Sequence, residues 1–122
     1  MDNNILLDFL RKLAPKLRND EIEDIDNIVE TLTMTQDHLA VIYQGYEAEE
    51  APEGAEMLRD LMMEALQLMF AGVDEFFNFL EDGQTERLDE GLALVEEGND
   101  IMTSIKHAVE NNQDWTSSAS LG

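Results

Sequence analysis

The fold follows from residues 57–80, which read MLRDLMMEALQLMFAGVDEFFNFL. Nearly every position is apolar, except Arg59 and a narrow polar stripe at Asp60, Glu64, Gln67, Asp74, Glu75 and Asn78. A helix with so broad an apolar surface must be covered on more than one side. The stretch therefore predicts the central helix of an all-α bundle, ending near Glu81, with its anchors at Leu58, Met62, Leu66, Met69, Phe76 and Leu80.

A second long helix is predicted directly after this one. Asp82 and Gly83 supply a C-terminal cap with glycine and Thr85 supplies an N-cap, a pattern typical of a tight αα-hairpin. Gly91 and Gly98 lie seven residues apart on one side of the second helix, where we expect them to allow close helix packing. The buried face of this helix is marked by Leu88, Leu92, Val95, Met102, Ile105 and Val109.

A long helix is also predicted before residue 57. Its apolar positions follow a spacing of three and four residues at Ile22, Ile25, Val29, Leu32, Gln36, Leu39, Tyr43 and Tyr46. The phase continues across three threonines, so one helix of about 28 residues is expected, with Asn19 or Asp20 as its N-cap. Residues 47–55, EAEEAPEGA, read as the loop that follows.

The first apolar pattern, from Ile5 to Leu17, predicts a shorter helix with Asp2 or Asn3 as its cap. We expect Pro15 to stop or kink it near Ala14. Together these elements predict an elongated antiparallel bundle of three long helices plus a short N-terminal helix. The bundle is expected to be one domain, residues 1–110, with a flexible tail at residues 111–122 that Trp115 alone could anchor.

Composition narrows the function. The 122 residues, 43% of them hydrophobic, suffice for one core. Twenty-eight acidic residues against seven basic ones give a net charge of −21, which disfavours nucleic acid and anionic membranes as partners. The longest apolar stretch, residues 61–73, contains Glu64 and Gln67 and is too short for membrane insertion. The amino terminus lacks an uncharged apolar core typical of a signal peptide, so we expect a cytoplasmic protein.

Catalytic and metal-binding patterns are missing from the sequence. Di-iron bundles need Glu-x-x-His, whereas Thr35 and Ser104 stand three residues before His38 and His107. Cysteine is absent, and the acidic runs lack the spacing of a calcium-binding loop. No catalytic triad context, phosphate-binding glycine loop or cofactor fingerprint is present. We therefore expect no metal, no cofactor and no enzymatic activity.

The sequence favours a non-catalytic protein-interaction module, such as an adaptor, a chaperone-like protein or a regulatory subunit. The short first helix cannot cover the whole central helix, so surplus apolar surface is expected to bind a second copy, giving a dimer, or another protein. An acidic mimic of nucleic acid that occupies a basic protein is the second hypothesis, and a metal-dependent bundle enzyme is the third. Adaptation to a salty cytoplasm would also explain the charge. The interface is predicted at Met63, Phe70, Phe77, Phe79, Phe9 and Leu13.

One local resemblance involves the predicted hairpin. Four short segments, EAL at 64–66, LEDG at 80–83, LDEGL at 88–92 and EEG at 96–98, resemble the helical hairpin of the small subunit of bacterial exodeoxyribonuclease VII. The resemblance covers fewer than half of the residues, and its residue types suit most αα-hairpins. It implies a hairpin here and does not assign the chain to that family.

Overall fold

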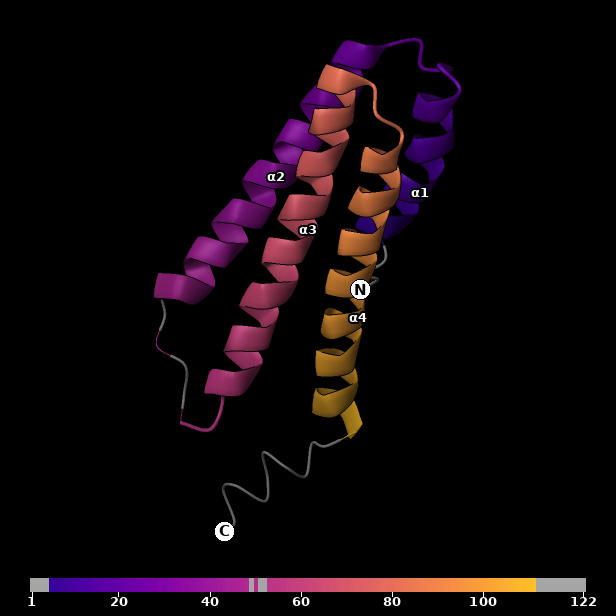
Figure 1. Ribbon diagram of the computed structural model, residues 1–122. Coiled ribbons are helices and arrows are strands. Elements are labelled where there is room, and N and C mark those ends of the chain that lie inside the picture. The colour runs from indigo at the N-terminus through magenta and orange to yellow at the C-terminus, as the bar shows by residue number, and fades with distance from the viewer. Residues whose placement is uncertain (1–4, 49, 51–52, 112–122) are drawn as a thin grey trace.

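The computed structural model describes residues 5–48, 50 and 53–111, with the backbone alone at 109–111. These residues form four α-helices, α1 (Ile5–Arg18), α2 (Ile25–Ala48), α3 (Glu56–Asp82) and α4 (Glu86–Asn111). α3 packs against both α2 and α4, and α1 packs against α4, in an elongated bundle (Figure 1). The predicted all-α bundle is confirmed. The predicted caps Asp2 and Asn3, and residues 112–122 of the predicted tail, which include Trp115, lie outside the described residues. Asn111, the first residue of the predicted tail, is the last residue of α4.

The core lies where all four helices meet. The buried leucines of α1 belong to the same cluster as Phe76 of α3, which is fully buried. Of the six anchors expected on α3, three are buried (Leu66, Met69 and Phe76) and three are half-buried (Leu58, Met62 and Leu80). The buried hydrophobic cluster comprises Leu7, Leu10, Leu13, Ala14, Leu17, Leu32, Leu39, Leu66, Met69, Val73, Phe76, Leu88 and Val95.

Three glycines bring α3 and α4 into close contact. A Cβ atom at Gly91 would lie 2.7 Å from the carbonyl oxygen of Gly72 and 2.8 Å from the Phe76 ring. At Gly98 it would lie 2.7 Å from the carbonyl oxygen of Ala65. Gly91 and Gly98 were predicted as packing glycines. Gly72 was not predicted, and a Cβ there would lie 2.6 Å from the Gly91 oxygen. Only glycine leaves room for the two backbones at these points.

α1 continues through Pro15 to Arg18, so the first of the two predicted outcomes, a stop near Ala14, is wrong. The last turn of α1 buries Leu17. Burial of a leucine contributes about 1.5–3 kcal/mol, which offsets much of the free-energy cost of the backbone hydrogen bond that proline removes. The helix ends at Arg18, and Asp20, two residues later, has a left-handed φ of 56°. There the amides of Asp20 and Glu21 donate back to the carbonyls of Leu17 and Lys16, as in a Schellman motif.

α2 is an unbroken helix through its threonines, as predicted, but it begins later than expected. Its first residue is Ile25, and the Asp24 carboxylate accepts a hydrogen bond from the Asn27 amide at 3.1 Å. Asp24 is therefore the N-cap, and the prediction of Asn19 or Asp20 was wrong. Because Asp20 closes α1, it is not available to begin α2.

The hairpin between α3 and α4 has the predicted boundaries. Gly83 has a φ of 70°, and its amide donates to the Phe79 carbonyl at 2.7 Å. This left-handed residue satisfies the end of α3. α4 then starts at Glu86, directly after Thr85, which places the turn at the end of the bundle that also holds the α1–α2 connection (Figure 1).

Candidate interaction surface

A groove lined mainly by apolar residues lies between α2 and α3. Its cavity has a volume of about 310 Å³. Leu39 and Leu66 form its buried floor, and Phe70 forms a wall with 39% of the residue exposed. We call it the α2–α3 groove, and its lining is Leu39, Ala40, Tyr43, Gln44, Leu66, Gln67, Phe70 and Ala71.

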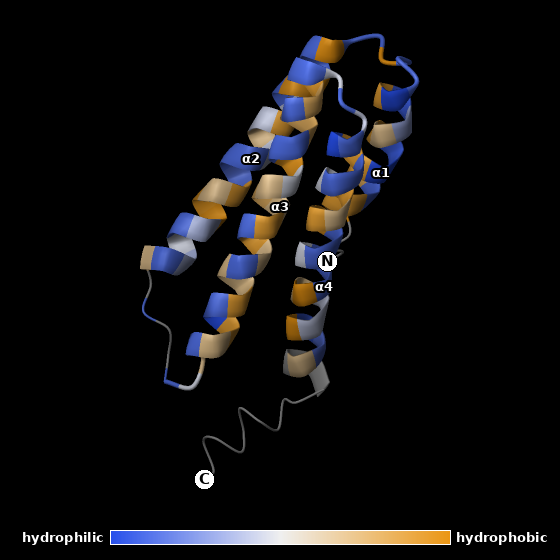
Figure 2. Cartoon of the chain, in the orientation of Figure 1, coloured by the Kyte–Doolittle hydropathy of each residue, from blue (hydrophilic) through white to orange (hydrophobic). Residues whose placement is uncertain are grey.

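The groove follows from side-chain size and helical spacing. Ala40 and Ala71 end at Cβ, so they leave space between the helices that a larger residue would fill. Two hydrogen bonds join the helices beside this space. The Gln67 amide donates to the Tyr43 hydroxyl at 2.9 Å, and the Gln36 amide donates to the Phe70 carbonyl at 3.3 Å. These two hydrogen bonds fix the spacing of α2 and α3. Hydrophilic and hydrophobic residues alternate along both helices (Figure 2).

Acidic side chains flank the groove on both helices. Asp37 and Glu47 on α2, and Glu64 and Asp74 on α3, are exposed, and each lies three or four residues from a lining residue. That spacing is about one helical turn, so the carboxylates lie beside the apolar lining. We call these four residues the acidic rim. α2 contains no Lys or Arg, and α3 contains only Arg59.

The six predicted interface residues do not form one surface. Phe70 lines the groove, and Met63 is half-buried on the same helix. Phe77, Phe79 and Phe9 are half-buried and pack against the core. Leu13 is 4% exposed and lies inside the core, so it offers no surface in this folded chain.

Two large apolar residues that the sequence did not predict as exposed lie on the outer side of α2. Met34 is 63% exposed and Val41 is 65% exposed. Their seven-residue separation, outside the buried spacing of α2, was the signal that could have found them. Met34 also lines a second hollow, of about 510 Å³, together with Ile5, Leu6, Phe9, Thr31, Thr35 and His38.

A cluster of charged side chains joins α3 and α4 near the hairpin turn. Arg87 contacts Asp82 at 3.1 Å and Glu75 at 3.4 Å. Burial alone would raise the pKa of Glu75, but hydrogen bonds with Asn78, Glu90 and Arg87, and the Arg87 charge, lower that pKa below its ordinary value. The amide of Gln84, with Arg87, lowers the pKa of Asp82, and both carboxylates raise the pKa of Arg87. These carboxylates are held ionised and paired, which suits a structural clasp better than proton transfer.

The part of the chain that the structure describes also bears on metal binding and membrane insertion. There, no three His, Asp or Glu side chains gather in a way that could hold a metal ion. None of the four described helices has the length and apolar character needed to cross a membrane. Comparison with protein-family models, curated proteins and solved structures gave no match.

Proposed function

We propose that this chain is a small acidic, non-catalytic protein-interaction module, an adaptor, chaperone-like protein or regulatory subunit, and that the α2–α3 groove is its contact surface. The exposed wall at Phe70 carries the proposal. Large aromatic side chains beside a preformed apolar depression are typical anchors at protein interfaces. The hydrogen bonds from Gln67 and Gln36 hold the groove open before a partner arrives.

The lining supports binding rather than catalysis. It consists of apolar and amide side chains, with Tyr43 as the one titratable group, and the Tyr43 hydroxyl already accepts a hydrogen bond from Gln67. A general acid or base needs a titratable group within reach of the reacting atoms. The rim carboxylates are exposed to solvent instead.

Self-association is one form of this proposal, with two copies meeting through their apolar surfaces as a dimer. Each copy carries a net charge of −21, so repulsion opposes the encounter at low ionic strength and screening favours it as salt rises. Sedimentation velocity at low and high salt tests this form. A dimer that strengthens with salt supports it, and a monomer at all salt concentrations contradicts it.

The groove also bears on the acidic decoy hypothesis. A mimic of nucleic acid presents charge to a basic partner and has no need of an apolar cavity. The α2–α3 groove with its acidic rim combines an apolar cavity and negative charge, so one surface can both attract a basic partner and make apolar contacts with it. A decoy predicts capture that disappears with salt, whereas a groove-bound partner keeps its apolar contribution.

Substitution of Phe70 tests the contact surface. We expect Phe70→Ala to reduce the fluorescence of bound Nile red, an uncharged apolar dye, by at least about half, because the wall of the groove is lost. Met57→Ala is the matched control, because Met57 is 74% exposed on the same helix and outside the groove lining. Circular dichroism checks that both variants fold. Equal loss in both variants, or no dye binding by the wild type, contradicts the assignment.

A further inference from the structure

We infer that the partner of the α2–α3 groove is a basic amphipathic helix, with large apolar side chains along one face and Lys or Arg on its flanks. The inference rests on the proposed function and names the chemistry of its ligand. Its basis is the combination of the groove's shape, its acidic rim and the way this chain already binds a helix of the same kind.

The shape of the groove suits a helix. It runs between two neighbouring antiparallel helices whose backbone hydrogen bonds are satisfied internally, so a ligand must bind through side chains. An amphipathic helix does this by placing side chains at i, i+3, i+4 and i+7 into an apolar depression. Phe70 and the small residues Ala40 and Ala71 provide the wall and the space for such anchors.

The negative charge around the groove favours a positively charged ligand. α2 and α3 carry four and seven acidic residues respectively, and Arg59 is their single Lys or Arg. Arg59 itself contacts Asp60 at 3.5 Å. A helix with basic flanks would place opposite charge beside Asp37 and Glu47 on one side and Glu64 and Asp74 on the other. An acidic helix with the same apolar face would meet repulsion there.

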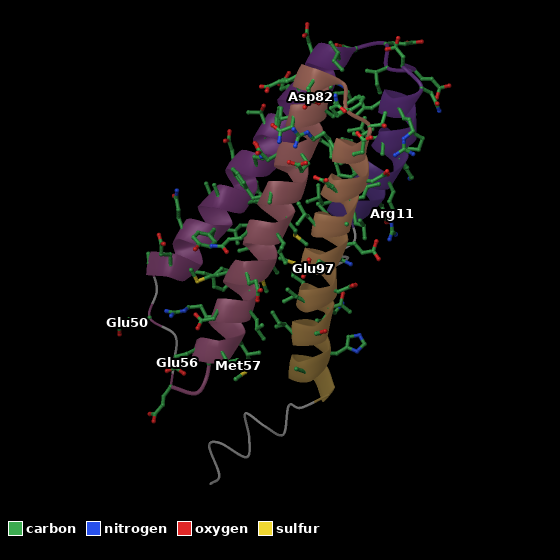
Figure 3. All side chains as sticks on the ribbon, in the orientation of Figure 1. Arg11, Glu50, Glu56, Met57, Asp82 and Glu97 are labelled. Carbon is green, nitrogen blue, oxygen red and sulfur yellow. The ribbon has the colours of Figure 1, made fainter. Side chains whose placement is uncertain are left out.

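α1 shows that this molecule binds a helix of this composition. α1 is amphipathic, its leucines enter the core, and its outer side carries four basic residues. Two of them reach acids on α4: Arg11 contacts Glu96 at 3.5 Å, and Arg18 contacts Asp89 at 2.6 Å. Figure 3 shows Arg11 on the α1 side of the bundle. The α2–α3 groove offers the same pairing of apolar lining and carboxylates, and neither α1 nor α4, the other two described helices, packs against α2.

A peptide titration tests the inference with defined probes. The first probe is an 18-residue amphipathic helix built from Leu and Lys, and the second has the same pattern with Glu in place of Lys. A third has the composition of the first in a scrambled, non-amphipathic order. We expect only the first to bind the full chain, measured by fluorescence anisotropy, and its amide shift changes to centre on Ala40, Gln44, Gln67, Phe70 and Ala71. Equal binding of the scrambled peptide, or shift changes centred on α1 and α4, would overturn the inference.

Two charge variants test whether the peptide binds at the groove or responds only to the net charge of the chain. Glu64→Gln with Asp74→Asn removes two acids of the rim, and Glu97→Gln with Asp100→Asn removes two exposed acids of α4. Both variants change the net charge equally, and α3 separates α4 from α2 (Figure 1). We expect the rim variant to weaken binding of the Leu/Lys peptide about five-fold, and the α4 variant less than about two-fold, as for exposed ion pairs. Equal weakening would show a diffuse effect of net charge and overturn the assignment to the groove.

Phe70→Ala separates this inference from the proposed function. If the Leu/Lys peptide does not bind, but Phe70→Ala still abolishes dye binding or dimer formation, the groove is an interaction surface and the basic-helix inference is wrong. If Phe70→Ala changes neither peptide binding nor dye binding, the proposed contact surface itself is wrong.

Discussion

At the scale of single residues, the three interhelical glycines make the sharpest prediction. A Cβ added at Gly91 meets the Gly72 backbone and the Phe76 ring at 2.7 and 2.8 Å, so Gly91→Ala must push the helices apart. Overpacking of this kind costs about 1–3 kcal/mol. Gly45→Ala is the control, because no atom lies within 4 Å of a Cβ there. Urea unfolding should show Gly45→Ala more stable than wild type by about 0.5–1 kcal/mol, the helix propensity gain. A stabilised Gly91→Ala would mean that α3 and α4 are less tightly packed.

A second residue-scale prediction concerns Glu75, whose pKa is lowered in the folded chain. A carboxyl with a lowered folded pKa stabilises the fold above its unfolded pKa of about 4.3, and this contribution is lost as pH falls through the folded value. Glu75→Gln should therefore lower the free energy of unfolding at pH 7 by about 0.5–1 kcal/mol, and this effect should become smaller as the pH falls through the folded pKa.

Glu64→Gln is the matched control for Glu75→Gln, because it removes the same charge from an exposed position on the same helix. Denaturant unfolding of both variants at pH 7 and near pH 3 makes the comparison. A difference between the variants that is as large near pH 3 as at pH 7 would show that the amide, rather than the lost charge, is responsible.

At the scale of helices, the start of α2 can be tested. Removal of an N-cap side chain costs about 0.5–2 kcal/mol, because a backbone amide loses its partner. We expect this cost for Asp24→Ala, since its carboxylate accepts from the Asn27 amide. Asp20→Gly should be neutral or stabilising, because glycine adopts the left-handed conformation of that residue more readily. Thermal unfolding measures both, and the reverse order would place the cap at Asp20, where the sequence alone had suggested it.

The helix ends show what sequence can and cannot predict. Local signals were sufficient at Gly83 and across the threonines of α2, because the glycine cap and the unbroken phase are properties of neighbouring residues. They did not show that α1 continues past Pro15, because burial of Leu17 against the other helices offsets the local cost of proline. Local signals also did not predict which aromatic side chains of α3 stay exposed. Periodicity predicts which residues lie on one face of α3, but whether Phe77 or Phe70 remains exposed depends on where α1 and α2 pack.

At the scale of the whole molecule, charge and salt make the final prediction. With 28 acidic and seven basic residues, repulsion among carboxylates opposes the compact state. The Debye length falls from about 30 Å at 0.01 M salt to about 8 Å at 0.15 M. At low salt each carboxylate therefore repels others along much of the bundle, and at moderate salt it repels only near neighbours. Because the repulsion is collective, we expect screening to raise the thermal midpoint by at least about 4 °C, equivalent to about 1 kcal/mol for a domain of this size.

The exposed ion pairs act against this rise in the thermal midpoint, because salt weakens their attraction. Arg11 with Glu96, and Arg18 with Asp89, attract each other across α1 and α4, and salt weakens both pairs. Exposed pairs contribute about 0.2–1 kcal/mol each, which is too little to outweigh repulsion among so many acids. Calorimetry from 0.01 to 0.3 M NaCl measures the balance, and a repeat near pH 4, where about half of ordinary carboxyls are protonated, should show a smaller rise. A midpoint that falls with salt at pH 7 would mean that the attachment of α1 through these pairs, rather than net charge, governs the stability of the bundle.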